Sequence, residues 1–562
     1  MLTRRDFLQV TAATAAIGAF SGNIARAATR QKITQDSLLD FKPVGQVTLL
    51  NITDMHAQLM PIYYREPSVN LGVGADRGLP PHITGKALLR HFHLRPGSPE
   101  AYAFACTDFT HLAREYGKVG GADRLATLVK AIRAERPHNT LLIDGGDSWQ
   151  GSYTSLKYQG DDMVQMQNLL GVDTMTAHWE FTYGTDRVKE LIKKLNFPFL
   201  AGNVFDNTWE EPVFAGIHYF ERGGVKIAVI GQAFPYTPVA NPRWMIPDWS
   251  FGIHQANVQK QVDEARAKGA QLVVLNSHDG FDVDRKLASK IHNLDVILTG
   301  HTHDAIPALV KVNGILLVAA GSHGKFLARL DLDVRGNKIH DYSFRLIPIF
   351  SDAIKPDPEM AALVEKLRKP YQAELTKVLA HTDSLLYRRG NFNGTFDDLI
   401  CDALLQERDT EICMSPGFRW GASLIPGQAI TQEDLYNMTA ITYPQAYRTQ
   451  MTGAQIKSVM EQVADNLFNV DPYYQQGGDM VRMGGMTYTI DPYKTIYHRI
   501  SDMRLNRNGK AIEPDAKYWV SGWASVNKGT EGPAIWDVVA KYLQHHNTVN
   551  IPDRPVAKIV GI

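Results

Sequence analysis

The sequence has few cysteines and no net charge, and each absence narrows the classes of protein that it can belong to. Among its 562 residues are three cysteines, which are too few for a disulfide framework or a cysteine-based zinc site. We interpret Cys106, Cys401 and Cys413 as small buried apolar residues, and the sequence leaves a single bridge open. Lys and Arg number 59, as do Asp and Glu, so no excess charge predicts general binding to nucleic acid or membranes.

The one long apolar run lies near the N-terminus. Residues 3–9 read Thr-Arg-Arg-Asp-Phe-Leu-Gln, the pattern of a twin-arginine export signal, and an alanine-rich apolar stretch follows over residues 10–20. Small residues at 25–27 suit signal peptidase, so residues 1–27 are predicted to be a removed signal peptide and no membrane anchor. An amphipathic helix is the weaker interpretation because the stretch has no polar face. The expected location is the bacterial periplasm.

Two globular domains are expected from the length and from a hydrophobic content of 44%. Residues 44–350 alternate between β-rich runs and helical patterns, which is typical of an α/β domain whose helices cover a sheet. We predict strands over 47–52, 140–143, 225–230, 271–275 and 294–298, and helices over 122–135, 187–195 and 255–268. Residues 60–112, rich in Pro, Gly and Arg, are expected to form a long loop insertion.

The pattern changes after the α/β region. Residues 355–380 are predicted to form one charged amphipathic helix that links two domains, because apolar residues recur there at helical spacing. Residues 381–562 have a mixed α+β pattern and are long enough for a second, smaller domain. No internal repeat or low-complexity tract is visible.

Side chains that can bind metal follow several predicted strands. Alone, each could be a helix cap, a turn residue or a buried histidine, but five placements after strands favour one site at the strand ends. Carboxylate and imidazole ligands without thiolate suit Mn, Zn, Fe or Ni rather than Ca or Mg. Seven candidates with one bridging carboxylate suffice for two ions. The candidates are Asp54, His56, Asp147, His178, His278, His301 and His303.

The order of these motifs, Asp-x-His, Gly-Asp, His-Trp-Glu, Ser-His and Gly-His-x-His, resembles the calcineurin-like metallophosphoesterases, and specifically their 5′-nucleotidase branch. Signatures at 417–419, 425–431 and 484–488 extend the resemblance over nearly the whole mature chain. It implies a four-layer α-β-β-α sandwich joined by a linker helix to a smaller α+β substrate-binding domain. It also implies one ion held by Asp54, His56, His303 and a shared Asp147, and a second ion held by Asp147, His178, His278 and His301.

One segment departs from the nucleotidase pattern. Nucleotidases read Gly-Asn-His-Glu-Phe-Asp where residues 177–182 read Ala-His-Trp-Glu-Phe-Thr. His178 therefore replaces a ligand Asn, Trp179 stands in place of the catalytic His, and Thr182 in place of its Asp partner. Trp cannot donate a proton to a leaving group as imidazole does. Residues 525–532 also lack the aromatic that stacks on a nucleotide base, so ordinary nucleotidase chemistry is disfavoured.

These departures, the export signal and the insertion at 71–82 resemble the thiosulfohydrolases of periplasmic sulfur oxidation within that branch. The resemblance implies hydrolysis of a cysteine S-thiosulfonate on a sulfur carrier protein of the SoxYZ type, whose cysteine lies on a flexible C-terminal tail. Metal-activated hydroxide would release sulfate and leave a persulfide on the carrier. The implied cofactors are two divalent metal ions, with Mn²⁺ the ion that the family suggests, although free competition would favour Cu or Zn.

The resemblance also suggests roles for residues outside the ligand set. Arg419 matches the substrate-binding arginine of the family and is the candidate anion clamp, with a surface ion pair as the alternative. Glu180 is expected to support a ligand histidine, and Trp179 to shape the pocket. Weaker candidates for substrate binding are Arg187, Arg114 and Asn203.

Other segments are expected to lie around the site. His82, His91 and His93 are interpreted as surface histidines rather than a further metal site. The insertion and residues 473–478 are expected to line a groove between the domains, because tyrosines are common in protein interfaces. For Tyr473 and Tyr474 in this segment, packing in the core is the alternative.

Two other functions stay open on the sequence. The first is a periplasmic 5′-nucleotidase or related phosphoesterase, which Trp179 and Thr182 disfavour. The second is a non-catalytic metal-binding component of a multiprotein assembly. It is disfavoured because all seven ligand positions hold competent side chains.

Overall fold

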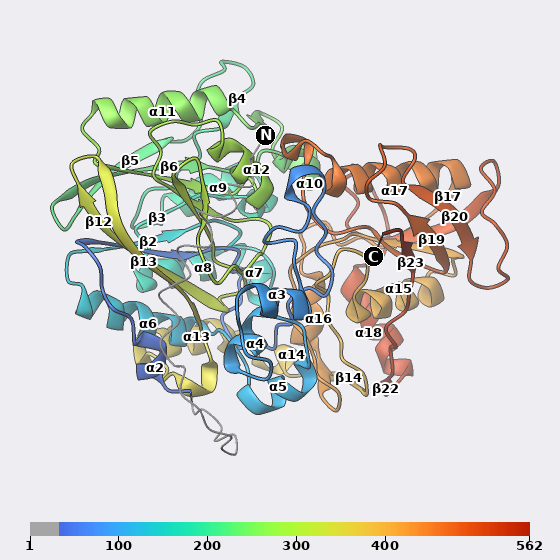
Figure 1. The fold of residues 1–562 in the computed structure, drawn as a ribbon. Coiled ribbons are helices and arrows are strands. Elements are labelled where there is room, and N and C mark those ends of the chain that lie inside the picture. Colours follow the sequence, from blue (N-terminus) through green and yellow to red (C-terminus); the bar gives the residue numbers. More distant parts are fainter. Residues whose placement is uncertain (1–32, 562) are drawn as a thin grey trace.

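The computed structural model describes residues 33–561. The predicted export signal, residues 1–27, lies outside the described residues. Figure 1 shows two units side by side, a larger one built from the first two thirds of the chain and a smaller one built from the last third. Within residues 33–561, no helix is both long and apolar enough to cross a membrane.

Two β-sheets form the centre of the larger unit. The central strands β1, β2 and β3 of one sheet are parallel, as are β6, β8, β9 and β11 of the other. The first sheet has the order β13 (Lys338–Pro348), β12 (Phe326–Arg335), β1 (Val47–Ile52), β2 (Thr140–Asp144) and β3 (Thr174–Met175). The second has the order β10 (Val310–Val312), β11 (Ile315–Ala319), β9 (Val296–Thr299), β8 (Leu272–Ser277), β6 (Val225–Gln232) and β5 (Ile217–Arg222).

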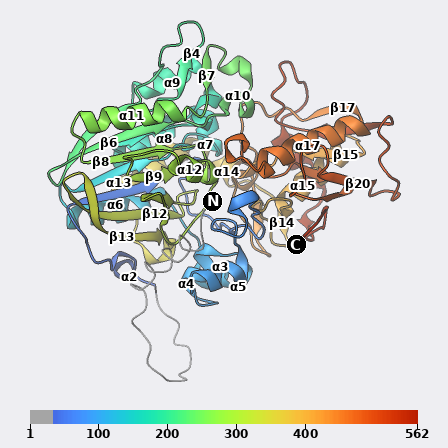
Figure 2. The ribbon, with the colours of Figure 1, turned by 45° about the horizontal axis from the view of Figure 1, so that its top comes forward.

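The strand β8 shows how these sheets are layered. Successive side chains of a strand point to opposite faces. Leu272 and Val274 belong to the core that both sheets share, whereas Val273 and Leu275 belong to the core under the helices α11 (Gln255–Ala267) and α12 (Phe281–Ala288). The helices α6 (Ala122–Glu135), α8 (Asp161–Leu170) and α13 (Pro358–Arg368) lie on the far side of the first sheet (Figures 1 and 2). The predicted four-layer α-β-β-α sandwich is confirmed.

The insertion at 60–112 is not one long loop, and that prediction is wrong. It contains α3 (Gly85–His91), α4 (Pro99–Phe104) and the first half of α5 (Phe109–Tyr116). Some of its prolines and glycines, such as Gly85 and Pro99, stand at helix ends, where they are tolerated, so the composition hides the helices. Pro99 opens α4 behind the cap Ser98, and Gly117 ends α5. Tyr102 of α4 is buried and donates to the Gly117 carbonyl over 2.7 Å.

The predicted single linker helix over 355–380 is also wrong. α13 begins behind the cap Asp357 and ends at Arg368, just before Lys369-Pro370. A proline disfavours helical backbone in the residue before it and removes a hydrogen-bond donor. A short α14 (Gln372–Leu375) follows, and β14 begins at Val378. Met360 and Leu367 of α13 are buried in the core of the larger unit, so α13 belongs to that unit.

The smaller unit combines three small sheets with four main helices. Their strands are β14 (Val378–Thr382), β16 (Ala429–Thr431) and β22 (Thr548–Val549); β17 (Tyr447–Thr452), β21 (Lys517–Gly522), β15 (Ile412–Ser415) and β18 (Arg482–Gly484); and β20 (Ile500–Leu505), β19 (Met486–Ile490) and β23 (Ala557–Ile559). The helices are α15 (Thr395–Glu407), α16 (Gln432–Thr439), α17 (Gly453–Phe468) and α18 (Ile535–His545). This is the α+β pattern expected from the sequence.

The remaining elements are short. In the larger unit they include α2 (Gln35–Leu39), α7 (Tyr153–Tyr158), α9 (Thr185–Ile192), α10 (Thr237–Ala240), and the paired strands β4 (Val204–Asp206) and β7 (Trp249–Phe251). Among residues 33–561 the three cysteines are free thiols, with Cys401 and Cys413 buried and Cys106 partly exposed.

Candidate metal centre

The seven candidate ligands meet at the carboxyl ends of strands from both sheets. β1, β2 and β3 lead to Asp54, His56, Asp147 and His178, and β8 and β9 lead to His278, His301 and His303. Ligand atoms of Asp147, His178, His278 and His301 lie within 4.8 Å of one another, as do those of Asp54, His56, Asp147 and His303. These two groups are the two ligand sets that the family resemblance implies.

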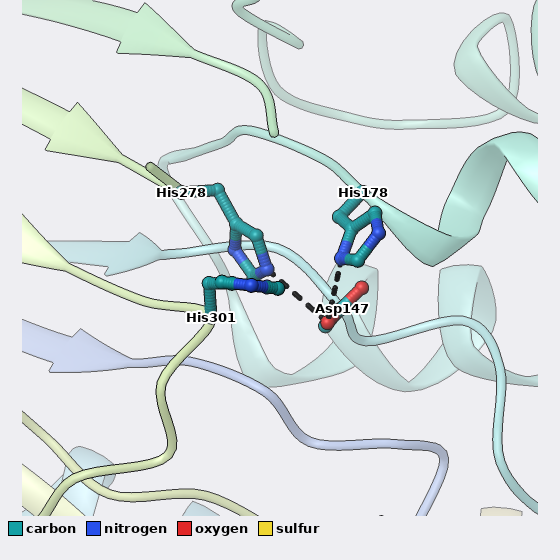
Figure 3. A group of neighbouring side chains, drawn as sticks. All are labelled: Asp147, His178, His278 and His301. Carbon is teal, nitrogen blue, oxygen red and sulfur yellow. Dashed lines mark hydrogen bonds and ion pairs between the residues drawn. The ribbon is translucent and has the colours of Figure 1, made fainter. Parts of the chain in front are cut away.

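Asp147 is common to both groups. Its Oδ2 atom lies 3.1 Å from His278 Nε2, 3.2 Å from His178 Nδ1 and 3.7 Å from His56 Nε2. Its Oδ1 atom accepts a hydrogen bond from the Trp179 backbone over 2.6 Å. Figure 3 shows His178, His278 and His301 arranged around this carboxylate. One oxygen faced by three imidazoles suits a carboxylate that bridges two cations.

In the group of Asp54, His56, Asp147 and His303, several ligand atoms face one another at short distances, and a cation between them would satisfy them together. His56 Nδ1 can only donate to the Gln150 carbonyl, 3.2 Å away, which leaves a lone pair on Nε2. That Nε2 lies 3.1 Å from His303 Nε2, and His303 Nε2 lies 3.2 Å from Asp54 Oδ1. Two imidazole nitrogens and a carboxylate converging on one point are the donor set of a metal site, and the Gln150 carbonyl orients His56 from behind.

The pKa values of the candidate ligand histidines also fit a cation site. Burial lowers the pKa of His56 to about 4 and those of His301 and His303 well below their usual value, so these rings are neutral. Burial would also lower the pKa of His278, but Asp147 and Asp54 outweigh it and raise that pKa to about 10. His278 Nδ1 donates to the Gly145 carbonyl over 2.6 Å, so the extra proton sits on Nε2, facing Asp147. A proton there occupies the place of a cation.

Unusual backbone conformations concentrate at the ligands. Five of the seven, all but His178 and His278, have positive φ angles between 44° and 74°. Such angles are uncommon outside glycine and cost on the order of 1–3 kcal/mol each, and they persist where surrounding contacts impose them. Gly300 shows how tight the packing is, because a Cβ atom there would lie 2.6 Å from Thr53 Oγ1.

Glu180 fixes two of the ligand loops through their backbone. Its buried carboxylate accepts hydrogen bonds from the amides of His178 and Ser148, both over 2.7 Å, and of Asp147 and Trp149, over 3.2 and 3.3 Å. Burial raises its pKa to about 7, against the lowering by these amides. The sequence predicts that Glu180 supports a ligand histidine, and the contact that it makes is with the His178 backbone rather than its ring.

Aromatic side chains enclose the ligands. Phe234 packs against His178 and His301 with ring centroids 4.1 Å away in each case, and Trp420 stacks on His56 at 5.7 Å. Trp179 lies 5.1 Å from His178 and meets Trp420 edge-on. The sequence singles out Trp179 but not the other two, although Phe234 also follows a strand end, that of β6.

Two arginines of the smaller unit lie beside the loop that carries His301 and His303. Arg419 donates to the carbonyls of Gly478 and His301, over 2.6 and 3.5 Å. Arg389 donates to the Thr302 carbonyl over 3.4 Å, and its nearest carboxylate, Asp304, is 4.0 Å away. Among residues 33–561 the Nε–H groups of both are buried without a hydrogen-bond partner. Arg389 is absent from the sequence-based candidates, because no strand or motif marks it.

The weaker sequence candidates lie elsewhere. Arg187 binds the Tyr158 carbonyl and Glu190, Arg114 binds the Pro426 carbonyl, and Asn203 pairs with the backbone of Ala233. His91 and His93 are exposed, as predicted. His82 is not a surface histidine, and that interpretation is wrong. Its ring is mostly buried and bonds Asp282 over 2.7 Å, a contact between distant segments that spacing does not reveal.

A cleft opens beside the centre between the two units. The larger unit contributes Leu71 and His82 from the insertion together with Asp279 and His301, and the smaller unit contributes Arg419 and Gly477. The segment at 473–478 crosses toward the larger unit, since Tyr473 donates to Gln255 over 2.9 Å. The insertion and this segment therefore both reach the cleft.

Comparison with known proteins gives three sequence-level findings. A family model for the 5′-nucleotidase C-terminal domain matches residues 378–540. The 5′-nucleotidase of Rattus norvegicus is 24% identical over 433 residues, which cover 69% of this chain and 72% of that protein. The trifunctional nucleotide phosphoesterase protein YfkN of Bacillus subtilis is 23% identical over 478 residues, which cover 76% of this chain and 32% of that protein.

Two solved structures are similar over nearly the whole described chain. The sulfate thiohydrolase SoxB of Thermus thermophilus superposes with a TM-score of 0.90 at 36% identity, covering 93% of this chain and 98% of that one. A 5′-nucleotidase precursor from the same organism superposes with a TM-score of 0.72 at 20% identity, covering 92% of this chain and all of the other. The second likeness concerns the fold alone.

Proposed function

Because this chain belongs to the 5′-nucleotidase family of metallophosphoesterases, we propose that it hydrolyses a cysteine S-thiosulfonate carried by a sulfur carrier protein. The products are sulfate and a persulfide that stays on the carrier. Its buried carboxylate and histidine groups fit the dimetal centre of a hydrolase of this family. The finer assignment of substrate rests on the likeness to SoxB and on one residue, Trp179.

Trp179 is the observation that carries the proposal. Its backbone is bonded to the shared ligand Asp147, and its ring meets Phe418 and Trp420 of the smaller unit edge-on at 5.6 and 5.1 Å. An indole in this place shapes the pocket but donates no proton to a leaving group. Thr182, at the position of the expected Asp partner, is bonded to Thr442 over 2.6 Å. A persulfide leaves as a far weaker base than an alkoxide and needs little protonation.

The cluster of seven candidate metal ligands also suits a sulfonate. A sulfonate is a tetrahedral oxyanion like a phosphoryl group, so a site of this family can orient it. Two divalent cations, for which we propose Mn²⁺, would polarise its oxygens and lower the pKa of water. The guanidinium groups of Arg419 and Arg389 lie beside His301 and His303 and would bind the oxygens that the ions leave free, while Arg419 Nε also faces Asp479 at 3.8 Å. Phe234, Trp179 and Trp420 would exclude bulk water from the reacting group.

The cleft offers a route for the carrier. A flexible C-terminal tail that bears the modified cysteine would enter between the insertion and residues 475–477 and reach the ligands at the cleft floor. The location proposed for this reaction is the periplasm, in line with the twin-arginine pattern of residues 3–9. Neither nucleic acid nor a membrane anchor is part of the proposal.

A nucleotidase or related phosphoesterase is the second candidate. The curated 5′-nucleotidases and the C-terminal domain model favour it, because the same two-metal centre serves phosphoester hydrolysis. The two candidates differ in the leaving group, so Trp179 separates them.

One assay decides between these functions. The purified, metal-loaded protein is given a cysteine-S-thiosulfonate peptide in one reaction and a nucleotide in another, and sulfate and phosphate are measured. Sulfate release supports the proposal, whereas phosphate release alone overturns it in favour of a nucleotidase. Neither product, with both ions bound, would indicate a metal-binding component without catalysis.

A further inference from the structure

His323 lies directly behind the metal centre, in the loop between β11 and β12. Its side chain is fully buried, and its ring centroid is 5.3 Å from that of His56 and 5.6 Å from that of His303. It belongs to neither ligand group. Its backbone amide donates to the Asp54 carbonyl over 2.8 Å, and its φ of 58° is like those of the ligands that it contacts. The ring therefore supports the centre without taking part in it.

The hydrogen bonds of this ring fix its tautomer. The backbone amide of Gly421, in the smaller unit, lies 3.0 Å from His323 Nε2 and can only donate, so Nε2 is the acceptor. The hydrogen of the neutral ring is then on Nδ1, which faces Ser322 Oγ at 2.8 Å. Ser322 in turn donates to the Tyr64 hydroxyl over 3.1 Å. The chain of donors runs in one direction, from Gly421 through His323 and Ser322 to Tyr64.

The segment held by this bond is the one that faces the ligands. Arg419 reaches the His301 carbonyl and Trp420 stacks on His56, so residues 419–421 meet three histidines of the larger unit. Gly421 has a φ of 143°, and a Cβ atom there would lie 2.4 Å from Met438 Sδ, so the backbone has little freedom to find another acceptor. A buried amide left without an acceptor is unfavourable, so the bond to His323 helps to fix where this segment lies, together with the bond from the Ser423 amide to the Tyr63 carbonyl two residues further on.

We propose that His323 is a positioning residue whose neutral imidazole, by accepting the Gly421 amide, holds Arg419 and Trp420 against the ligand histidines. The role rests on the proposed function only in that Arg419 is the anion clamp there. The position of this segment against the metal centre then depends in part on one hydrogen bond behind the centre. His323 contacts no reacting atom, and a displaced clamp would weaken substrate binding more than turnover.

The test compares two substitutions of this residue in the full-length, metal-loaded protein. His323→Phe keeps an aromatic ring, somewhat larger than imidazole, but removes the acceptor. We expect amide hydrogen exchange at Gly421 to become about 10- to 100-fold faster, the range set by leaving a buried amide unpaired. KM for the thiosulfonate peptide should rise about tenfold or more, with a smaller change in kcat and two ions still bound. His323→Gln can accept from Gly421 and donate to Ser322, and should restore both readouts at least in part.

Tyr443→Phe is the matched control, because it also removes one hydrogen bond between the units, that to the Ala240 carbonyl at 2.8 Å. It should leave Gly421 exchange and KM unchanged. The proposal is wrong if His323→Phe leaves both readouts unchanged, or if His323→Gln is no better than Phe. Should His323→Phe not fold, Ser322→Ala, which removes the acceptor that orients the ring, must accelerate Gly421 exchange or the proposal falls.

These readouts separate the two proposals. If the wild-type protein releases no sulfate, the proposed function fails, but exchange at Gly421 and its restoration by Gln still test the role of His323. If sulfate is released and the exchange pattern is absent, only the positioning role fails.

Discussion

The two sides of the cleft come from different units and are built from different residue types. We call the side with the seven candidate ligands the floor, and the side with Arg389, Arg419 and Trp420 the cap. The larger unit supplies carboxylates and imidazoles, all buried and mostly on strained backbone, and Glu180 ties their loops together. The smaller unit supplies guanidinium groups and an indole, Arg389, Arg419 and Trp420, that approach the same place from the opposite side. The floor can hold two cations for any tetrahedral oxyanion, so the floor indicates the reaction class. Under the proposed function, the cap, with Trp179 at its edge, would distinguish one substrate from another.

Substitution of the shared floor carboxylate gives the largest expected effect. Asp147→Asn removes the charge that faces His178, His278 and His56, so both ion sites would lose the negative charge of their shared ligand. Sulfate release should fall about a thousandfold or more, since loss of a single transition-state donor elsewhere costs 10²–10³. Elemental analysis should find fewer than two ions per chain. Two bound ions with full activity would refute the shared-ligand assignment.

Substitution in the cap should leave the ions in place. Arg419→Gln and Arg389→Gln each remove charged donors worth about 1.5–3 kcal/mol, or about 10- to 150-fold in binding. We expect KM for the thiosulfonate peptide to rise by that amount with metal content unchanged. Arg187→Gln, in an arginine bonded to Tyr158 and Glu190 away from the centre, is the control. Loss of metal in either cap variant would contradict the view that the floor binds the ions and the cap binds the substrate.

Glu180 lets the floor be weakened without removing a ligand. Glu180→Gln keeps the shape but replaces a carboxylate that accepts from four amides. The affinity for metal should fall about 10- to 100-fold, as is typical when a supporting partner is lost. Titration of the metal-free protein with Mn²⁺ measures it. An unchanged affinity would mean that the strained loops hold their shape unaided.

Trp179→His changes a residue that contacts both the floor and the cap, and it tests whether Trp179 decides between the two substrates. It introduces an imidazole beside Asp147 and removes packing against Phe418 and Trp420. Sulfate release should fall about tenfold, because a misplaced group near the chemistry has costs of up to 10²-fold. Hydrolysis of a phosphomonoester should rise above the wild-type background. Unchanged sulfate release without any phosphatase activity would contradict the role given to Trp179.

The last effect concerns pH, at about tenfold for each pH unit. In the metal-free protein the pKa of His278 is raised to about 10, so its Nε2 carries a proton at neutral pH that a cation must displace. The apparent affinity for metal should therefore rise with pH, about tenfold per unit between pH 7 and 9 for one displaced proton. Calorimetry in buffers of different ionisation enthalpy counts the protons. An affinity that does not change over this range would show that the ring is already neutral.

The clustering of the seven candidate ligands was predictable because each follows a strand, and apolar runs in the sequence mark the strands. β1 has the predicted bounds, and α6 matches its predicted range. The three helices of the insertion were hidden, since glycine and proline mark helix ends as well as loops. Arg389, Trp420, Phe234 and His323 were missed because tertiary contacts alone bring them to the centre. His82 was misread for the same reason, as its partner Asp282 is distant in sequence.

The candidate ligands are divided between two sheets, and this division determines when the site can be completed during synthesis of the chain. Asp54 is made early and His303 much later, and neither sheet alone provides all the ligands of either group. A chain still under synthesis therefore has no complete site until β9 has joined its sheet. Metal uptake would then report that the ligand-bearing strands of both sheets have come together, from β1 to β9.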